Sequence, residues 1–237
     1  MHGPKIIHDE NGKIFIERFS LIRRIEHILI ILAFLILAIT GMPQKFYETA
    51  WLGDLMDLIG GLDRARTIHH LTGILFSIQL MLHLLYIVIG IALKKISLSL
   101  LPRMQDWRDL SSSIKYYFGY KKTPPQYDTF DYKQKFEYVS ILSAAIIMSI
   151  SGIVLLAPVF ATTFFSGQIV PAARIAHSNE ALLAILLILI WHIYGAHFAP
   201  ETFPMDKTIF TGLINKDDLK AKHPLEYNRL FPEDKKN

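Results

Sequence analysis

The residues of this chain best suited to chemistry are its histidines. Seven of the ten histidines lie in or at the ends of long apolar segments. Four of them occupy matched depths: His27 opens the first segment and His69 the second, while His177 and His192 bracket the fourth. An imidazole in hydrocarbon is costly unless it is paired or ligates something, so an ionisable residue at this depth usually marks a functional site.

Neutral imidazole is the commonest metal ligand in proteins and a usual axial ligand of haem iron. Four histidines at two depths therefore predict two b-type haems, each held by two histidines and stacked across a bilayer. Cysteine is absent from the sequence. This excludes disulfides, thiolate zinc sites, cysteine-ligated iron–sulfur clusters and covalently attached haem. Any redox cofactor must therefore be held without covalent bonds.

Four apolar runs must position these histidines. They cover residues 22–42, about 68–93, about 136–159 and about 174–198. Each run is long enough to cross a bilayer as a helix, which takes about 20 residues. We therefore expect an all-α membrane protein with a four-helix transmembrane bundle over 22–198, an N-terminal segment (1–21) and a C-terminal tail (199–237). Gly41 and Pro43 are expected to end the first helix.

The charges of the connections predict which side of the membrane each one faces. Residues 1–24 carry five Lys and Arg and the 94–135 connection carries nine, whereas 43–66 carries three and 158–174 carries one. Because basic residues are retained on the cytoplasmic side, both termini and the middle connection should be cytoplasmic. The net charge of +4 fits an anionic membrane surface better than nucleic acid. We expect a multi-pass protein of a bacterial or archaeal cytoplasmic (inner) membrane, with no nucleic-acid partner.

This orientation pairs the four histidines. His27 begins its span at the cytoplasmic side, whereas His69 and His177 begin theirs at the outer side. His192 follows His177 by 15 residues, which is about 22 Å along a helix at roughly 1.5 Å per residue. Fifteen residues at about 100° each return to within about 60° of the starting face, so both rings can face one interior. The predicted pairs are His27 with His192, and His69 with His177.

The second span contains two adjacent histidines, of which only one can point into the bundle. Gly73 lies four residues after His69 and on the same helix face, where it leaves room for a flat macrocycle. This favours His69 as the ligand and leaves His70 facing a neighbouring helix or a propionate. The remaining polar segments contain three histidines that we expect to face water: His2, His8 and His223.

Two further histidines are alternative ligands. His83 lies 14 residues after His69, at the cytoplasmic depth. It therefore competes with His27 as the partner of His192, or otherwise bonds a propionate, a quinone or a backbone carbonyl. His197 is expected to cap the end of its helix, with a third haem between His83 and His197 as the alternative.

Other polar residues complete the predicted site. Arg66 and Arg174 each precede a ligand by three residues and are candidates for haem propionates, which guanidinium binds through charge-assisted hydrogen bonds. A quinone site needs hydrogen-bond partners for two carbonyls, and the approach to the third span supplies Tyr132, Gln134 and Lys135 as candidates.

Two short surface helices are also expected. Residues 103–118 can form an amphipathic helix on the cytoplasmic surface, with Trp107 at the interface. The apolar stretch 51–62 is expected to form a short helix at the outer surface, where it could also dock an extracytoplasmic partner.

Five motifs follow one another over most of residues 18–198: RFSLIRRIEHILIILAFLILAITG, RTIHHLTG, YKQKFEYVS, RIAH and WHIYGAHF. With these motifs the chain resembles the cytochrome b subunit of membrane-bound formate dehydrogenases and nickel–iron hydrogenases, within the bacterial cytochrome b561-like di-haem family. The resemblance implies that His27, His69, His177 and His192 are the axial ligands of two haem b groups. It also implies a site for menaquinone or ubiquinone near the cytoplasmic haem.

The resemblance further implies a redox partner on the outer side of the membrane. This partner would be an iron–sulfur protein, a hydrogenase, a formate dehydrogenase or a multihaem cytochrome c. The C-terminal tail, from HFAPETFPMDKTIFTG to HPLEY, is longer than expected of the hydrogenase and formate dehydrogenase members. It resembles variants associated with multihaem cytochromes.

The expected function is electron transfer between this extracytoplasmic partner and the quinone pool. The chain would then be a subunit of an oxidoreductase complex and not its primary catalytic subunit. One alternative is a histidine-based proton or ion transporter, but such a protein should pair carboxylates with histidine inside the spans, and Glu26 and Glu180 lie only at span ends. The other is a purely structural anchor of a redox enzyme, which would not need histidines at matched depths.

Overall fold

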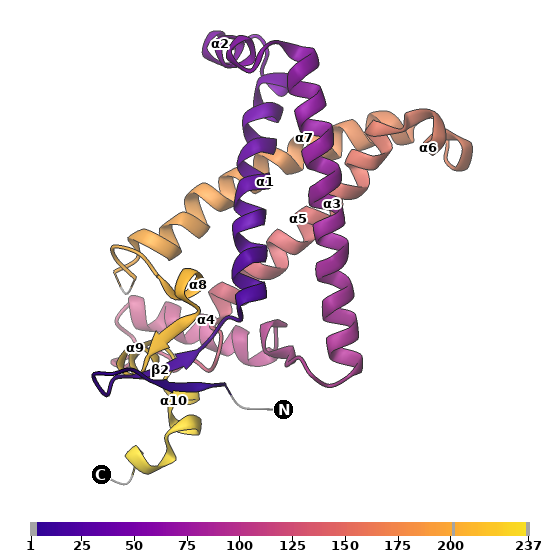
Figure 1. The fold of residues 1–237 in the computed structure, drawn as a ribbon. Coiled ribbons are helices and arrows are strands. Elements are labelled where there is room, and N and C mark those ends of the chain that lie inside the picture. The colour runs from indigo at the N-terminus through magenta and orange to yellow at the C-terminus, as the bar shows by residue number, and fades with distance from the viewer. Residues whose placement is uncertain (1–3, 201, 236–237) are drawn as a thin grey trace. The chain divides into compact units, whose positions relative to one another are not determined.

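The computed structural model describes residues 4–200 and 202–235 (Figure 1). Four helices are long and apolar enough to cross a membrane, as the four apolar runs predict. They are α1 (Leu21–Lys45), α3 (Leu62–Ala92), α5 (Tyr132–Leu156) and a fourth over Ile169–Phe198, which comprises α7 (Ile169–Leu186) and the π-helical segments η2 (Leu187–His192) and η3 (Tyr194–Phe198).

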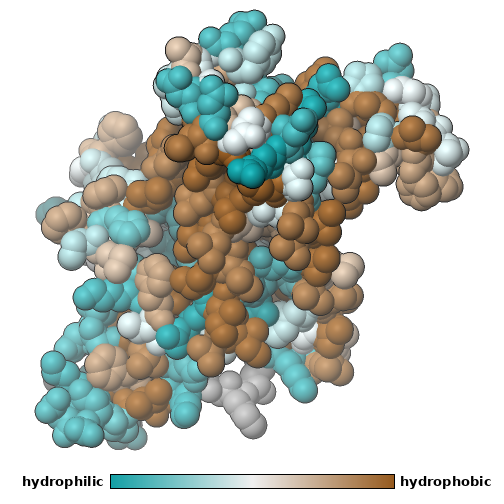
Figure 2. Space-filling view, turned by 45° about the horizontal axis from the view of Figure 1, so that its top comes forward, coloured by the Kyte–Doolittle hydropathy of each residue, from teal (hydrophilic) through white to brown (hydrophobic). Residues whose placement is uncertain are grey.

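The surface of these helices is suited to lipid. Large apolar side chains remain about half exposed along them, including Leu29 (50%), Leu75 (58%), Ile153 (56%) and Leu189 (56%). Figure 2 shows apolar side chains covering the helical shafts, with hydrophilic side chains gathered near α2. Hydrocarbon offers no partner to backbone groups, and a helix satisfies this constraint because it closes its backbone hydrogen bonds within the segment.

The first spanning helix is longer than predicted. The expectation that Gly41 and Pro43 end it is wrong, because α1 continues through both residues to Lys45. A proline near a helix end removes one backbone hydrogen bond, which membrane helices tolerate. Gly41 has a packing role instead, described below.

By their contacts the described residues form two compact units. One contains residues 25–88 and 141–193, and the other contains 1–24, 89–140 and 194–237. The first of these is a helical unit. In it α1 and α3 lie side by side, and the side chain of Gln79 on α3 donates a hydrogen bond of 2.9 Å to the backbone carbonyl of Glu26 on α1.

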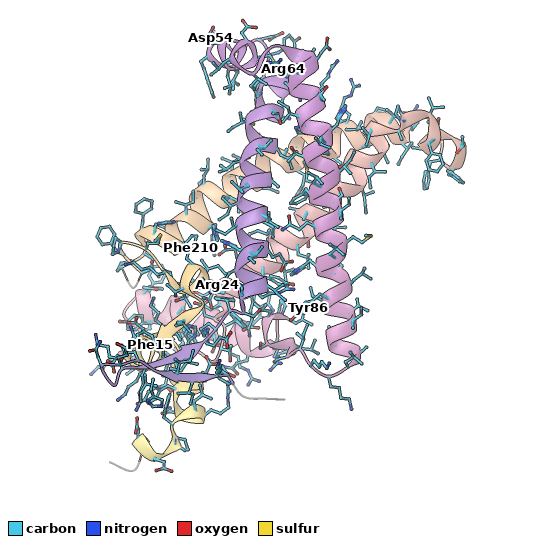
Figure 3. All side chains as sticks on the ribbon, viewed as in Figure 1. Phe15, Arg24, Asp54, Arg64, Tyr86 and Phe210 are labelled. Carbon is cyan, nitrogen blue, oxygen red and sulfur yellow. The ribbon has the colours of Figure 1, made fainter. Side chains whose placement is uncertain are left out.

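Short helices form both connections of the helical unit. The predicted helix at 51–62 is observed as α2 (Ala50–Ile59). It ends at Gly60, whose φ of 102° lies in the left-handed region that glycine favours. Asp54 on α2 and Arg64 in the first turns of α3 flank this turn (Figure 3). The second connection contains α6 (Pro158–Phe164), a helix that the sequence analysis did not predict.

The other unit contains the extramembrane segments. A three-stranded antiparallel sheet joins β1 (Ile6–His8), β2 (Ile14–Glu17) and β3 (Leu213–Asn215) in the order β1-β2-β3. The sheet is an addition to the all-α architecture that the sequence predicts. Its small core contains Ile16, Ile214, Leu219 and Tyr227. The remaining elements are η1 (Leu98–Leu100), α4 (Met104–Tyr117), α8 (Thr208–Thr211), α9 (Lys216–Lys222), α10 (Pro224–Leu230) and η4 (Pro232–Lys235).

The predicted amphipathic helix at 103–118 is observed as α4. Its inner face contacts the start of α5, where Lys135 forms an ion pair of 2.7 Å with Asp106. It also contacts the connection before α5, where the Tyr127 hydroxyl lies 3.0 Å from that of Ser113. The opposite face leaves Trp107 68% exposed. This arrangement suits a helix that lies in the membrane interface.

The C-terminal tail is held to the connection before α5. The Arg18 guanidinium pairs with the Glu226 carboxylate and donates to the Thr129 carbonyl. The ring of His223 donates from Nδ1 to the Asp128 carbonyl at 2.7 Å. The expectation that His223 faces water is wrong: its side chain is buried, and its burial and the positive charge of Arg18 lower its pKa to about 4.

Candidate functional site

The structure brings together the two histidine pairs that the depths predict. His27 on α1 faces His192 on η2, with ring centroids 6.2 Å apart. His69 on α3 faces His177 on α7, also with ring centroids 6.2 Å apart. The planes of the rings are inclined by 50° in the first pair and by 73° in the second. All four residues belong to the helical unit.

The separation of the rings fits one metal ion between each pair. A metal–imidazole bond is about 2.0 Å long and its nitrogen lies roughly 1.1 Å from the ring centroid, so two imidazoles on opposite sides of a metal have centroids about 6 Å apart. Each pair supplies only two ligands. A bis-histidine haem needs no more from the protein, because the macrocycle supplies the other nitrogen ligands of the iron.

The π-helical segment bears on how His192 is oriented. An α-helix would leave His192 about 60° from the face of His177. In a π-helix each N–H bonds the carbonyl five residues back, so each residue turns less about the axis than in an α-helix. Residues Leu187–His192 are π-helical. Their smaller rotation per residue reduces the angle between the faces of His177 and His192. The ideal α-helix used for the sequence prediction could not include this correction.

The Nδ1 atoms of the His69–His177 pair contact hydroxyl groups. Nδ1 of His69 lies 2.9 Å from Oγ1 of Thr40, and Nδ1 of His177 lies 3.0 Å from Oγ of Ser151. Metal-bound histidines usually have such a partner on the nitrogen that does not bind the metal. The sequence predictions assigned neither Thr40 nor Ser151 to the site.

Each hydroxyl is followed by a glycine that makes room for the same ring. A Cβ atom at Gly41 would lie 3.0 Å from Cε1 of His69, and one at Gly152 would lie 3.3 Å from Cε1 of His177. The expected close-approach glycine, Gly73, has more space, since its Cβ would reach only Leu37 at 3.9 Å. The signal available in the sequence is a hydroxyl–glycine dipeptide in the first and third spans.

The alternative histidines have other surroundings. Nδ1 of His83 lies 2.6 Å from the Glu26 carboxylate. His70 is exposed while His69 is half-buried. His197 lies in η3 with its ring next to that of Phe198, at 6.2 Å between centroids.

The predicted arginines lie near the His69–His177 pair in sequence, and both are exposed. Arg174 lines an open pocket with Val170, Pro171 and Ile175. A different cation anchors the ligand-bearing helix: the Lys45 ammonium donates to the Ser178 hydroxyl and to the Asn179 amide oxygen, each at 3.1 Å. These bonds tie the end of α1 to the turn of α7 that follows His177.

The predicted quinone residues have local partners. Lys135 is buried and paired with Asp106, as described above. Gln134 exchanges hydrogen bonds with Asp131 at the start of α5, donating from its backbone and accepting with its side chain. The ring of Tyr132 lies 6.2 Å from that of Tyr127. The quinone role therefore remains a prediction.

Comparison with known proteins shows the family of the chain. The sequence profile of the prokaryotic cytochrome b561 family matches residues 18–206. The formate dehydrogenase cytochrome b556 subunit of Haemophilus influenzae is 26% identical over 205 residues, which cover 86% of this chain and 79% of the relative. The cytochrome b556(Fdn) subunit of the nitrate-inducible formate dehydrogenase of Escherichia coli is 23% identical over 215 residues, 91% of each chain. Because the family profile matches most of its length, the chain belongs to the prokaryotic cytochrome b561 family.

Proposed function

We propose that this protein holds two b-type haems and carries electrons between an extracytoplasmic redox partner and the membrane quinone pool. Family membership supports the coarser role of a membrane cytochrome b that contains haem b and transfers electrons. One observation carries the two-haem proposal: two separate histidine pairs have the ring separation that a bis-histidine metal site requires.

The residues that hold each group follow from the pairs. His27 and His192 would hold one haem, and His69 and His177 would hold the other. Bound haem supplies a reversible one-electron couple. The chain orients the imidazoles, keeps water away with apolar helices and provides Arg66 and Arg174 as candidates for the propionates.

The charge distribution supports an orientation for the two sites. With both termini and the 94–135 connection in the cytoplasm, the His27–His192 site lies toward the cytoplasm and the His69–His177 site toward the outside. The quinone site belongs near the former, with Tyr132, Gln134 and Lys135 as candidates. The partner belongs near the latter, where the short helices α2 and α6 lie in the two outer connections.

The nature of the partner is inferred from the relatives. Both are cytochrome subunits of formate dehydrogenases by name, which supports a redox enzyme as the partner of this chain. An iron–sulfur subunit, a hydrogenase, a formate dehydrogenase or a multihaem cytochrome c would all deliver electrons at the outer surface. The chain lies in the cytoplasmic membrane and acts as the electron-transfer subunit of that complex.

Haem stoichiometry tests the proposal. Pyridine haemochromogen spectra of the purified full-length protein should give two haem b per chain. His69→Ala and His177→Ala should each remove the same haem, identified by its midpoint potential, and His27→Ala and His192→Ala should each remove the other. His8→Ala, on the exposed hairpin, is the control and should retain both. A haem-free wild-type protein made with haem available would leave the transporter and structural-anchor alternatives.

A further inference from the structure

We propose that Thr40 and Ser151 are positioning residues that fix the tautomers of His69 and His177 and lower the midpoint potential of the haem between them. The inference rests on the proposed haem function and goes beyond it by assigning a role to two hydroxyl groups that bind no iron. Both act through a histidine, and neither contacts a reacting atom.

The hydroxyl proton of Thr40 is already committed to its own helix. Its Oγ1 donates to the carbonyl of Ile36 at 2.7 Å, with the Leu37 carbonyl at 3.4 Å. A hydroxyl has one proton to donate and two lone pairs that accept. The contact of 2.9 Å with Nδ1 of His69 must then be one in which the ring donates. The proton therefore lies on Nδ1, and Nε2 presents its lone pair to a metal.

Ser151 repeats this arrangement on a different helix. Its Oγ donates to the carbonyl of Ile147 at 2.6 Å, with the Met148 carbonyl at 3.3 Å, and lies 3.0 Å from Nδ1 of His177. The same argument gives His177 a proton on Nδ1. Both rings of the pair thus present a metal-binding Nε2.

The repetition extends to the surrounding chain. In each half, a spanning helix with a hydroxyl–glycine dipeptide is followed by a short helix and then by a spanning helix with the histidine. The first half consists of α1, α2 and α3, and the second of α5, α6 and α7. The glycine holds the ring close, since a Cβ there would lie 3.0 or 3.3 Å from Cε1. Two independent occurrences of one arrangement favour a shared task over chance packing.

The chemical consequence follows from the direction of the hydrogen bond. A ring that donates from Nδ1 gains electron density at Nε2 and becomes a more basic ligand. A hydroxyl that is itself donating is a stronger acceptor, because hydrogen bonds in a chain polarise one another. Stronger donation from both imidazoles stabilises oxidised iron over reduced iron, so the two hydroxyls lower the midpoint potential of this haem.

The chain offers matched control variants for the test. Thr67 donates to the Asp63 carbonyl at 2.9 Å and Ser77 to the Gly73 carbonyl at 2.9 Å. Both therefore share the hydroxyl-to-carbonyl bond of the proposed pair, and neither hydroxyl has a hydrogen bond to an imidazole among the described residues. Thr67→Val and Ser77→Ala report the cost of removing such a bond from a spanning helix.

The experiment is a potentiometric titration of the full-length protein in lipid, with haem content measured on each sample. Thr40→Val and Ser151→Ala should each raise the midpoint potential of the haem that His69→Ala removes. A tenfold change in the reduction equilibrium corresponds to 59 mV for one electron. We expect each variant to raise the midpoint potential by close to this amount. The double variant should shift further, Thr40→Ser should restore the wild-type value, and the other haem should not shift.

The outcomes separate the inference from the proposed function. A wild-type protein with two haems whose potentials are unchanged in Thr40→Val and Ser151→Ala would overturn the inference and leave the function standing. A wild-type protein without haem would overturn both. If Thr40→Val loses one haem, recovery in Thr40→Ser and retention in Thr67→Val support the positioning role, whereas an equal loss in Thr67→Val overturns it.

Discussion

Nδ1 of His83 lies 2.6 Å from Oε1 of Glu26, the residue that immediately precedes His27. By sequence, His83 is a rival of His27 because both have the depth needed to face His192. In the structure His27 faces His192, and His83 contacts a carboxylate on the neighbouring helix. Glu26 thus gives His83 a partner that is not a metal.

This contact predicts that His83 can be replaced without losing a haem. His83→Ala and His83→Gln should retain two haem b per chain, whereas His27→Ala should retain one. Pyridine haemochromogen assays of the three variants, purified in parallel, provide the measurement. A loss of haem in His83→Gln with full retention in His27→Ala would reverse the assignment and give a pairing of His83 with His192.

A second prediction concerns the glycines beside the ligand rings. Gly41→Ala and Gly152→Ala should weaken haem binding at the His69–His177 site, because the new methyl groups would lie 3.0 and 3.3 Å from Cε1 of the rings. The effect should be larger at Gly41, where the gap is smaller. Haem content and dissociation of haem to an acceptor protein would both report it.

Gly73→Ala is the matched control for these variants. Its methyl group would lie at an ordinary contact distance of 3.9 Å from Leu37. Alanine in a helix is favoured over glycine by roughly 0.5–1 kcal/mol, so this variant should bind haem normally and be no less stable. A haem loss in Gly73→Ala equal to that in Gly41→Ala would show that the macrocycle, and not the ring, occupies the space.

A third prediction is that the docked C-terminal tail loosens in acid. The pKa of His223 falls from 6.5 to about 4 in the docked state because of burial and the charge of Arg18. Between these values the released tail binds more protons than the docked one, so docking becomes stronger as pH rises through this window. It is at full strength above about pH 6.5 and declines as pH falls toward 4. The full shift in the pKa of His223 corresponds to about 3 kcal/mol in the free energy of docking the tail.

Fluorescence energy transfer can measure this equilibrium. The chain has no cysteine, so the exposed positions Asn11 and Glu233 can be changed to cysteine and labelled specifically. In urea titrations from pH 7 to pH 4.5, the urea concentration at which half of the tail is released should decrease as the pH is lowered. In a His223→Asn background the amide keeps a donor for the Asp128 carbonyl but cannot titrate, and this part of the pH dependence should disappear. An unchanged slope in that background would assign the effect to another group.

A fourth prediction places α4 in the membrane interface. The helix exposes Met104 (75%) and Trp107 (68%), and Phe118, directly after its last residue, is also exposed (75%). In a Trp51→Phe, Trp191→Phe background, the fluorescence of Trp107 should be quenched by phospholipids brominated near the headgroup end of the acyl chain. Bromines near the end of the chain should quench it less. Failure of both lipids to quench Trp107 would show that α4 faces water or another protein.

The sequence by itself determined the spanning helices and the depths of the histidines within them. A helix in hydrocarbon satisfies its backbone hydrogen bonds within the segment, so local composition suffices to predict it, and the four apolar runs correspond to the four observed helices. Depth depends only on the direction of each span and the residue count along it. It predicted the pair His69–His177 and left His27 and His83 as rival partners of His192. In the structure His69 faces His177 and His27 faces His192.

Tertiary structure alone decided the details that depend on contacts distant in sequence. Strands β2 and β3 pair across almost the whole chain, with Ile16 opposite Ile214. His223 is buried where the tail contacts the connection before α5, and its ring donates to the Asp128 carbonyl. Gly41 lies inside α1 and, having no Cβ, leaves space for the ring of His69 from another helix. Thr40 and Ser151 likewise have a role only once a second helix brings an imidazole within hydrogen-bond distance. Local composition specifies the spanning helices, whereas packing decides the partner of each side chain.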